Sequence, residues 1–357
     1  MRIGIDARKI NDTGIGRYIE NLVEWLLKVD SKNEYVLFLA AKDAGRLSFP
    51  ESRVTKVIET AGKYSLKEHW ALAAKAKELG LSLFHAPHYV LPLFMKTPSV
   101  VTVHDLIHLT GPGFHPAERA YARFMIGSAA NRARRVITVS ESTKNDMVSI
   151  LGVPPEKISV ILNGGGADFS RTSDEDIEGM LKQLGMAPGY FLFVGSDRPH
   201  KNLDAIPRVM DIMGDDCVFA IVGRVNDGKK AEFERFGGRT VFFYNLDKRH
   251  MQALYSGAQA LLFPSTHEGF GLPPLEAMAC GTPVVASDSS CIPEIVGDAA
   301  MLAAPTDYGK MAEGLLKLKN ERLFRKEMVE RGYERTHLFS WEKTAMMTLD
   351  VYRAAIS

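Results

Sequence analysis

The sequence has little of what marks several classes of protein. Only three of its 357 residues are cysteines, and Cys217, Cys280 and Cys291 show neither metal-ligand spacing nor a paired framework. That pattern fits a reducing compartment and argues against a fold built on disulfides or zinc. The formal net charge is only +1, so no excess of basic residues indicates a nucleic acid as partner.

Long hydrophobic runs are also missing. No apolar stretch approaches the roughly 20 residues that a membrane-spanning helix needs. Met1 leads directly into the strand-like segment Arg2–Asp6, and we therefore expect no signal peptide. These features predict a cytoplasmic protein, with any membrane contact peripheral and on the cytoplasmic face.

Short apolar, β-branched runs alternate with amphipathic stretches along the whole chain. Continuous apolar strands separated by helices favour an α/β fold whose parallel sheets are covered on both faces. The helical pattern is clearest at residues 16–29 and 116–131. We expect strands at residues 3–6, 35–39, 54–58, 83–86, 99–103, 136–139, 160–162, 190–195, 218–223, 241–244, 260–264, 283–286 and 301–302.

The length of 357 residues suits two domains. The best boundary lies between Asn163 and Gly189, where a glycine run, an acidic helix and a Pro-Gly turn follow one another. In doubly wound sheets ligands bind beyond the carboxyl ends of the strands, so the loops after strands should carry the chemistry. We expect Rossmann-like domains at residues 1–168 and 185–338 and a C-terminal helix at residues 339–357 that packs back toward the first domain.

Two carboxylates, Glu268 and Glu276, follow the strand expected at residues 260–264. The glycines between them let a ligand approach the backbone closely, and free N–H groups at the start of a helix form an anion site. A carboxylate in a nucleotide pocket is suited to accept hydrogen bonds from ribose hydroxyls. A tight strand-to-helix turn with two solvated glutamates is the alternative interpretation.

The string from Glu268 to Glu276 resembles the E-x7-E signature of family 4 glycosyltransferases, and residues 279–287 and 293–300 are similar to its continuation. This family has the GT-B fold, two Rossmann-like domains with parallel sheets facing across a cleft. The resemblance implies that Glu276 binds the donor ribose and Glu268 the transferred sugar. It also implies that sugar and phosphate bind the backbone N–H groups of the intervening turn, formed by Gly269, Phe270, Gly271 and Leu272.

Basic residues follow the strand expected at residues 190–195. Cations at such a position can neutralise a diphosphate, both during binding and as a leaving group gathers charge. Lys201 matches the lysine that family members use to grip the diphosphate. Arg198 is an offset candidate for their arginine, because His200 and Ser196 occupy the usual positions. A solvated basic turn is the alternative for Arg198.

The first expected strand is followed by a Gly-x-Gly loop at Gly14 and Gly16. By itself such a loop also fits NAD binding. The segment resembles the glycine loop that family 4 enzymes place against the donor when the cleft closes, so the resemblance implies donor or acceptor contacts at both glycines. His104 and Asp105 resemble the family's His-Asp motif, whose histidine lies near the donor sugar. The alternative is a histidine satisfied by local backbone.

Two histidine pairs mimic metal-ligand spacing, His85 with His88 and His104 with His108. Pro87 interrupts the first pair, and the resembled enzymes need no bound metal for transfer. We therefore predict no metal site and no required cofactor, with a nucleoside diphosphate sugar as the donor substrate.

The sequence thus predicts a retaining hexosyltransferase of surface polysaccharide or lipopolysaccharide synthesis that acts on a glycan or lipid-linked acceptor. The mannosyltransferase-type bacterial branch is the most similar, which makes GDP-mannose the first donor, ahead of UDP- and ADP-sugars. A nucleotide-sugar epimerase, a non-catalytic nucleotide-sugar-binding protein and an NAD-dependent oxidoreductase are the alternatives.

One basic and aromatic stretch allows contact with anionic lipid of the inner membrane. An ordinary solvated face is the alternative interpretation. The residues concerned are Arg119, Tyr121, Arg123, Phe124, Arg132, Arg134 and Arg135.

Overall fold

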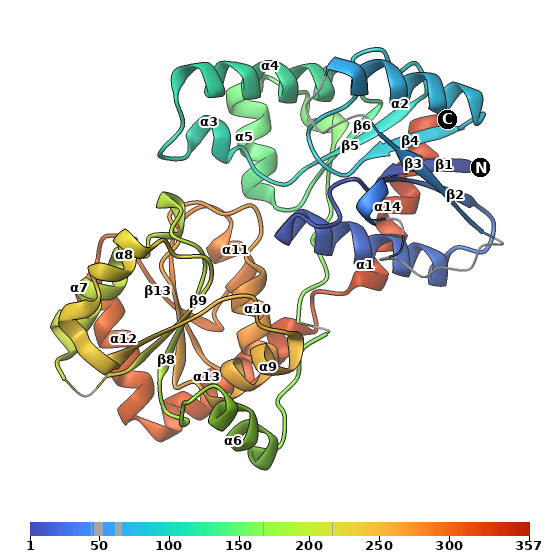
Figure 1. Ribbon diagram of the computed structural model, residues 1–357. Helices are drawn as coiled ribbons and strands as arrows, with labels where there is room; N and C mark the ends of the chain where they lie inside the picture. The colour runs from blue at the N-terminus through green and yellow to red at the C-terminus, as the bar shows by residue number, and fades with distance from the viewer. Residues whose placement is uncertain (44, 46–52, 61–65, 167, 216) are drawn as a thin grey trace. The chain divides into compact units, whose positions relative to one another are not determined.

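The computed structural model describes residues 1–43, 45, 53–60, 66–166, 168–215 and 217–357. They form two compact units. The first contains Met1–Gly164 and Ser340–Ser357, and the second contains Gly165–Phe339. Each unit is a parallel sheet covered by helices, as the alternation of apolar and amphipathic segments predicts (Figure 1).

In the described part of the first unit, seven strands form a sheet in the order β3-β2-β1-β4-β5-β6-β7, and all of its pairs are parallel. The central strands β4 and β5 are buried along their whole length, which explains why their sequences are mostly apolar. The strands are β1 (Arg2–Asp6), β2 (Glu34–Ala40), β3 (Val54–Glu59), β4 (Leu83–Ala86), β5 (Ser99–Val103), β6 (Arg135–Thr138) and β7 (Ile158–Val160).

Helices cover both faces of this sheet. One apolar core lies beneath α1 and α14, and another lies beneath α2, α4 and α5. Helix α1 forms because Tyr18, Ile19, Leu22, Val23 and Leu26 make one buried stripe at helical spacing. The helical segments are α1 (Thr13–Val29), η1 (Ala41–Asp43), α2 (Leu66–Glu78), α3 (Ile107–Thr110), α4 (Pro116–Arg132), α5 (Glu141–Leu151), η2 (Pro155–Lys157) and α14 (Trp341–Ile356).

Helix α14 ends the chain but belongs to the first unit. It begins after Ser340, whose side chain accepts a hydrogen bond from the Lys343 amide as an N-cap. It packs along α1, and Tyr352 is fully buried in the core that the two helices share. The first unit is therefore completed by residues that follow the second in sequence.

In the described part of the second unit, six parallel strands form a sheet in the order β10-β9-β8-β11-β12-β13. The two central strands, β8 and β11, are followed by the basic segment and the acidic segment singled out above. The strands are β8 (Phe191–Val194), β9 (Phe219–Val222), β10 (Thr240–Phe243), β11 (Ala260–Phe263), β12 (Val284–Ser287) and β13 (Ala300–Ala303).

The second unit surrounds this sheet with helices, and its core includes residues from α7, α12 and α13. The helical segments are α6 (Asp174–Gln183), η3 (Pro199–Lys201), α7 (Ala205–Met213), α8 (Asp227–Ala231), η4 (Glu234–Arg239), α9 (Lys248–Gly257), α10 (Leu272–Ala279), α11 (Ile292–Val296), α12 (Tyr308–Asn320) and α13 (Arg322–Thr336).

The structure differs from the sequence expectations at two places in the first unit. Helix α1 begins at Thr13, so Gly14 and Gly16 lie in its first turn rather than in a loop. The strand expected at residues 160–162 runs from Ile158 to Val160 instead. The two compact units divide between Gly164 and Gly165, and α6 packs on α9 of the second unit.

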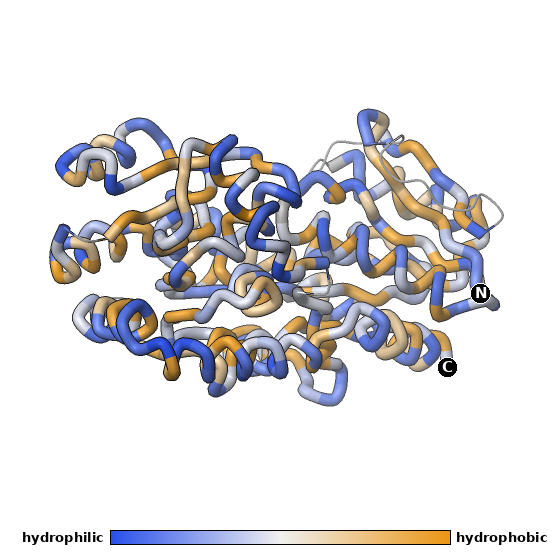
Figure 2. The backbone as a smooth tube through the Cα atoms, turned by 90° about the horizontal axis from the view of Figure 1, so that it is seen from below, coloured by the Kyte–Doolittle hydropathy of each residue, from blue (hydrophilic) through white to orange (hydrophobic). Residues whose placement is uncertain are grey.

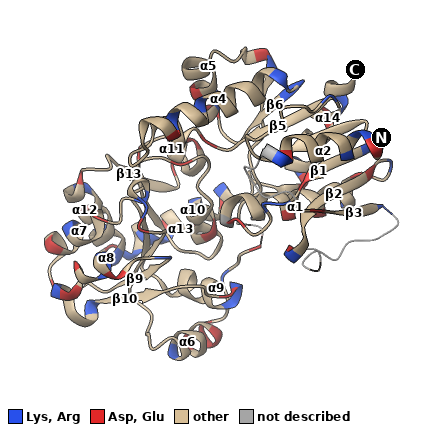
Figure 3. Ribbon diagram, turned by 45° about the horizontal axis from the view of Figure 1, so that its top comes forward, with Lys and Arg blue, Asp and Glu red and all other residues tan. Residues whose placement is uncertain are grey.

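Charge and hydropathy follow this layering. Hydrophobic residues concentrate in the interior segments of each unit (Figure 2), and residues of both charge signs are interspersed over the helices and loops (Figure 3). Among the described helices, none combines the length and the apolar character that crossing a bilayer demands.

Candidate active site

The turn between β11 and α10 is built around Gly271. This residue is the N-cap of α10 and has φ 105° and ψ 58°, a conformation that glycine adopts without the steric cost of a Cβ. Apart from its neighbours in the chain, no described residue has an atom within 4 Å of the position that a Cβ would occupy there. The turn thus leaves open space beside its backbone, where a ligand can approach.

The turn also presents free hydrogen-bond donors. Among the described residues, no partner is found for the amides of Gly269, Phe270, Gly271 and Leu272. The next two residues, Pro273 and Pro274, have no backbone N–H and therefore leave no unpaired donor in the first turn of the helix. Free amides at a helix N-terminus favour negative charge. The four amides of Gly269–Leu272, here called the amide cradle, can therefore bind an anion.

An ion pair joins the two segments that were predicted separately. Lys201 Nζ lies 2.6 Å from Glu268 Oε1, and the exposed fractions of the two side chains are 21% and 13%. The contact follows from topology, because β8 and β11 are parallel neighbours and their carboxyl ends share one edge of the sheet. Lys201 Nζ also lies 5.6 Å from the centroid of the Phe263 ring.

The lysine segment is fixed to the acidic segment by hydrogen bonds. Asn202 has φ 54°, and its side-chain amide donates to the carbonyls of Pro264 at 3.0 Å and Pro305 at 2.9 Å. The Thr266 amide donates to the His200 carbonyl at 2.8 Å. Lys201 is thus held against the turn that carries Glu268.

Glu276 has a different partner. It is only 4% exposed, and its Oε2 accepts a hydrogen bond of 2.8 Å from the hydroxyl of Tyr255 in α9. Tyr255 was not among the site residues predicted from the sequence. Its position within the amphipathic helix α9 gives no sign of the contact, which depends on the packing of α9 against α10.

The two candidates for the diphosphate arginine position differ in exposure. His200 is 9% exposed and its carbonyl holds Thr266. Arg198 is exposed, and its side chain makes no hydrogen bond or ion pair with another described residue. Of the two, only Arg198 has a cationic group that is accessible to a ligand.

In the first unit, Gly14 and Gly16 have unequal environments. A Cβ on Gly16 would lie 2.1 Å from the carbonyl oxygen of Ile10, whereas a Cβ on Gly14 would meet no atom of the described residues within 4 Å outside its own helical turn. Gly16 is therefore required by the packing of α1 on the segment before it. Gly14 has no such structural requirement.

His104 follows β5 and is partly exposed. Its Nε2 lies 2.9 Å from the Pro87 carbonyl, which can only accept, so Nε2 carries the proton and Nδ1 is left as an acceptor in the neutral ring. Burial lowers the pKa of His104, although the bond to Pro87 acts against this effect. The Tyr18 ring packs edge-on at 4.8 Å between ring centroids and fixes the imidazole plane.

The histidine pairs considered for metal binding are engaged elsewhere. His85 is fully buried and is hydrogen-bonded through Nδ1 to the Tyr352 hydroxyl at 2.7 Å and through Nε2 to Thr102 Oγ1 at 2.8 Å. Burial lowers its pKa to about 3. Among the described residues, no three His, Cys, Asp or Glu side chains gather as metal ligands would.

A buried charged cluster at the end of β1 was missed by the sequence analysis. Arg8 donates two hydrogen bonds to Asp6, at 2.8 and 2.7 Å, and one to Glu68 at 3.0 Å. All three are at most 3% exposed. Burial raises the pKa of Glu68, and the Arg8 charge opposes that rise. The cluster fixes the segment that leads into α1.

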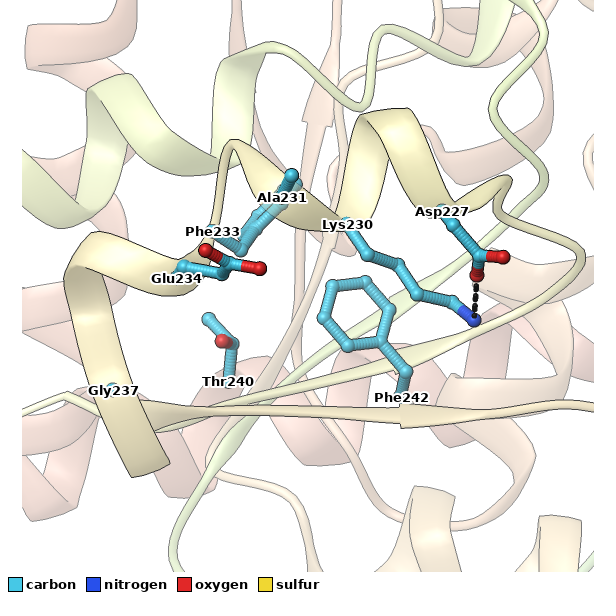
Figure 4. A pocket seen from close by; sticks show the side chains of 8 residues that line it. All are labelled: Asp227, Lys230, Ala231, Phe233, Glu234, Gly237, Thr240 and Phe242. Atoms are coloured by element: carbon cyan, nitrogen blue, oxygen red, sulfur yellow. Dashed lines mark hydrogen bonds and ion pairs between the residues drawn. The ribbon is translucent and has the colours of Figure 1, made fainter.

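A surface pocket of about 520 Å³ lies elsewhere in the second unit (Figure 4). It is bounded by α8, η4 and the edge strand β10, and the Asp227–Lys230 ion pair of 3.2 Å lies at one end. None of the predicted site residues lines it. The lining residues are Asp227, Lys230, Ala231, Phe233, Glu234, Gly237, Thr240 and Phe242.

Two family models match the chain. Residues 13–165 match the one described as Glycosyltransferase Family 4, and residues 182–335 match the one described as Glycosyl transferases group 1. Together the two matches span both compact units and include the amide cradle, the Lys201–Glu268 pair and His104.

Individual proteins are also similar. O-antigen chain mannosyltransferase B of Escherichia coli is 26% identical over 379 residues, which cover 96% of this chain and 96% of that protein. O-antigen chain mannosyltransferase RfbU of Salmonella typhimurium is 31% identical over 229 residues, which cover 62% of this chain and 60% of that protein. Sucrose-phosphate synthase from Thermosynechococcus elongatus has a TM-score of 0.82 at 18% identity, covering 99% of this chain and 98% of that one. This structural likeness shows a shared GT-B fold.

Proposed function

Because the chain belongs to glycosyltransferase family 4, we propose that it moves a hexosyl group from a nucleoside diphosphate sugar to a glycan or lipid-linked acceptor. Mannose from GDP-mannose is the first candidate, since two relatives are named as O-antigen mannosyltransferases. Those names also favour a role in surface polysaccharide or lipopolysaccharide synthesis. The observation that carries the proposal is the cradle of free amides at Gly269–Leu272 beside the Lys201–Glu268 pair.

The second unit would bind the donor. Glu276 accepts hydrogen bonds from the ribose hydroxyls, and the amide cradle and Lys201 hold the diphosphate. Arg198 adds an accessible positive charge. Glu268 then accepts hydrogen bonds from hydroxyls of the sugar to be transferred.

Bond cleavage would place negative charge on the departing diphosphate. Fixed amides and a cation that are already oriented stabilise such charge without reorganisation, and one donor of this kind changes kcat by roughly 10²–10³-fold. We propose that these groups suffice without a divalent metal. Transfer would retain the anomeric configuration, with same-face attack and the leaving phosphate assisting deprotonation of the acceptor hydroxyl.

The first unit would contribute His104 and the segment of Gly14 and Gly16. The Nδ1 of a neutral His104 is suited to accept a hydrogen bond from a sugar hydroxyl. We therefore expect His104→Ala to lower transfer by about 2- to 10-fold, the value of one such neutral bond, and to leave nucleoside diphosphate affinity unchanged.

A thermal-shift screen over GDP-, UDP- and ADP-sugars tests the proposal. A ligand at 100 times its Kd stabilises the folded protein by about 2.7 kcal/mol. We expect GDP-mannose to give the largest rise in Tm and EDTA to leave it unchanged. A shift with NAD alone, or none with any nucleotide sugar, would contradict the proposal.

Release of nucleoside diphosphate separates the remaining alternatives. A transferase releases it when acceptor is added. A nucleotide-sugar epimerase produces an altered nucleotide sugar without acceptor, and a binding protein produces neither.

We also propose that α4 contacts the inner membrane. Tyr121 and Phe124 are 46% and 60% exposed on this helix. Arg119 and Arg132 donate to backbone carbonyls, so both have a structural role in addition to their charge. We expect Phe124→Ala to reduce co-sedimentation with phosphatidylglycerol vesicles, and Leu323→Ala, at an 84% exposed position of the second unit, to leave it unchanged.

A further inference from the structure

The segment after β12 holds the acidic turn through its carbonyl groups. Ser290 Oγ donates to the Glu268 carbonyl at 2.7 Å. Cys291 Sγ lies 3.2 Å from the carbonyl oxygens of both Glu268 and Phe270. Ser287, the last residue of β12, donates through its Oγ to the carbonyl of Ser265, which lies shortly before the turn. Because β11 and β12 are parallel neighbours, the segments that follow them meet at the same edge of the sheet.

These contacts determine where the amides of the turn point. The described chain has no cis peptide bond, and in a trans peptide the N–H points opposite to the C=O. The Glu268 carbonyl shares its peptide with the Gly269 amide, and the Phe270 carbonyl shares its peptide with the Gly271 amide. Since both carbonyls face Cys291, both amides face away from it.

The amides so directed are free. Neither Gly269 nor Gly271 donates its N–H to another described residue. The carbonyls of the same peptides would repel an anion if the planes turned over. The orientation of two peptide planes therefore decides whether the turn attracts or repels a diphosphate.

The side chains that hold the planes are suited to this role. Cys291 is fully buried, and its single S–H is shared between the two carbonyls. Ser290 has φ 56°, a region that serine rarely adopts and that persists only where surrounding contacts impose it. Ser290 thus has an unfavourable backbone conformation, and in that conformation its hydroxyl donates to the Glu268 carbonyl.

We propose that Ser290 and Cys291 are positioning residues that aim the Gly269 and Gly271 amides at the diphosphate of the donor. The proposal rests on the function proposed above. It identifies the side chains that orient the cradle, although neither of them touches the ligand.

The test compares Ser290→Ala and Cys291→Ala with the wild type. Affinities for GDP and UDP are measured by titration calorimetry, and those for guanosine and uridine by NMR titration. We expect roughly tenfold weaker diphosphate binding, the effect of one hydrogen bond to a charged group, with nucleoside binding unchanged. Transfer should show a lower kcat as well, because the same amides stabilise the leaving group.

Two further variants serve as controls. Cys291→Ser keeps a donor at the same position and should restore most of the affinity. Cys217→Ala removes another buried thiol, whose Sγ donates to the Gly214 carbonyl at 3.4 Å, and should have no effect on binding. Should Cys291→Ala fail to fold, the partly exposed Ser290 carries the test alone.

Equal loss of diphosphate and nucleoside affinity, or wild-type diphosphate affinity in the folded variants, would overturn the positioning role while leaving the proposed function intact. A wild-type protein that binds neither GDP, UDP nor ADP would instead refute the proposed function, and this inference with it.

Discussion

Lys201 Nζ lies 2.6 Å from Glu268 Oε1, so the cation that we assign to the donor diphosphate is held by the carboxylate that we assign to the donor sugar. Both side chains are largely shielded from water, which strengthens their attraction. The pair fixes each group close to where its ligand would bind. It also makes the two residues energetically dependent on each other.

A double-mutant cycle should reveal this dependence. Lys201→Ala removes the cation and leaves an uncompensated carboxylate beside the diphosphate, so we expect kcat to fall about 100-fold. Adding Glu268→Gln should cost less than the product of the single effects, because the repulsive charge is then gone. Steady-state transfer rates measure both. Lys230→Ala removes a lysine from an exposed ion pair of the same unit and is the control. Strictly multiplicative effects would refute the coupling.

Glu276 should govern donor affinity. We expect Glu276→Ala to raise the donor KM by about 10- to 100-fold, since a hydrogen bond to a buried carboxylate is lost. Tyr255→Phe should raise it only a few-fold, because the carboxylate remains and loses one donor. Nucleoside affinity should fall in parallel with donor affinity. A Glu276 variant with unchanged nucleoside binding would exclude the ribose assignment.

The two glycines of α1 should respond differently to the same substitution. Gly16→Ala forces a methyl group against the Ile10 carbonyl and should lower the Tm markedly. Gly14→Ala has space for its methyl group and should keep or slightly raise the Tm, since alanine favours the helix by about 1 kcal/mol. Loss of transfer activity in a stable Gly14→Ala protein would indicate a close ligand at that position. Full transfer activity of the Gly14→Ala protein would show that Gly14 is not in close contact with the ligand.

His85 should make stability depend on pH. Its pKa is lowered to about 3 in the folded protein, against about 6.5 in the unfolded chain. The unfolded state therefore binds one more proton in that window, and stability is lost as pH falls from about 6.5 toward 3, by about 1.4 kcal/mol per pH unit. Urea unfolding at pH 7, 6 and 5 should show a shallower dependence for His85→Gln. His250→Gln, on α9, is the control, and equal slopes for His85→Gln and wild type would contradict the assignment.

The sequence predicted the positions of the strands because most of them are short runs dominated by apolar and β-branched residues. The strands expected at residues 83–86 and 99–103 agree with β4 and β5 residue for residue. The start of α1 was misplaced because Gly14 and Gly16 are typical of loops, and the packing that accommodates them was not visible. The local sequence pattern thus predicts the positions of helices and strands more reliably than the residues at which they begin and end.

The site was only partly predictable for a related reason. Motif spacing indicated Glu268, Glu276 and Lys201, but the residues that hold them are distant in sequence. Tyr255 is 21 residues from Glu276, and Ser290 reaches Glu268 across 22 residues. Side-chain contacts to backbone carbonyls leave no periodicity in a sequence. They emerge only when neighbouring strands bring their following segments together.

The membership of α14 in the first unit affects how the protein is made. The ribosome synthesises the chain from its amino end at about 5–20 residues per second. Tyr352, the buried partner of His85, is therefore translated only after the whole of the second unit. Until α14 is translated, the surface of α1 that packs against α14 stays uncovered. Chaperone dependence during synthesis should accordingly be concentrated in the half that is translated first.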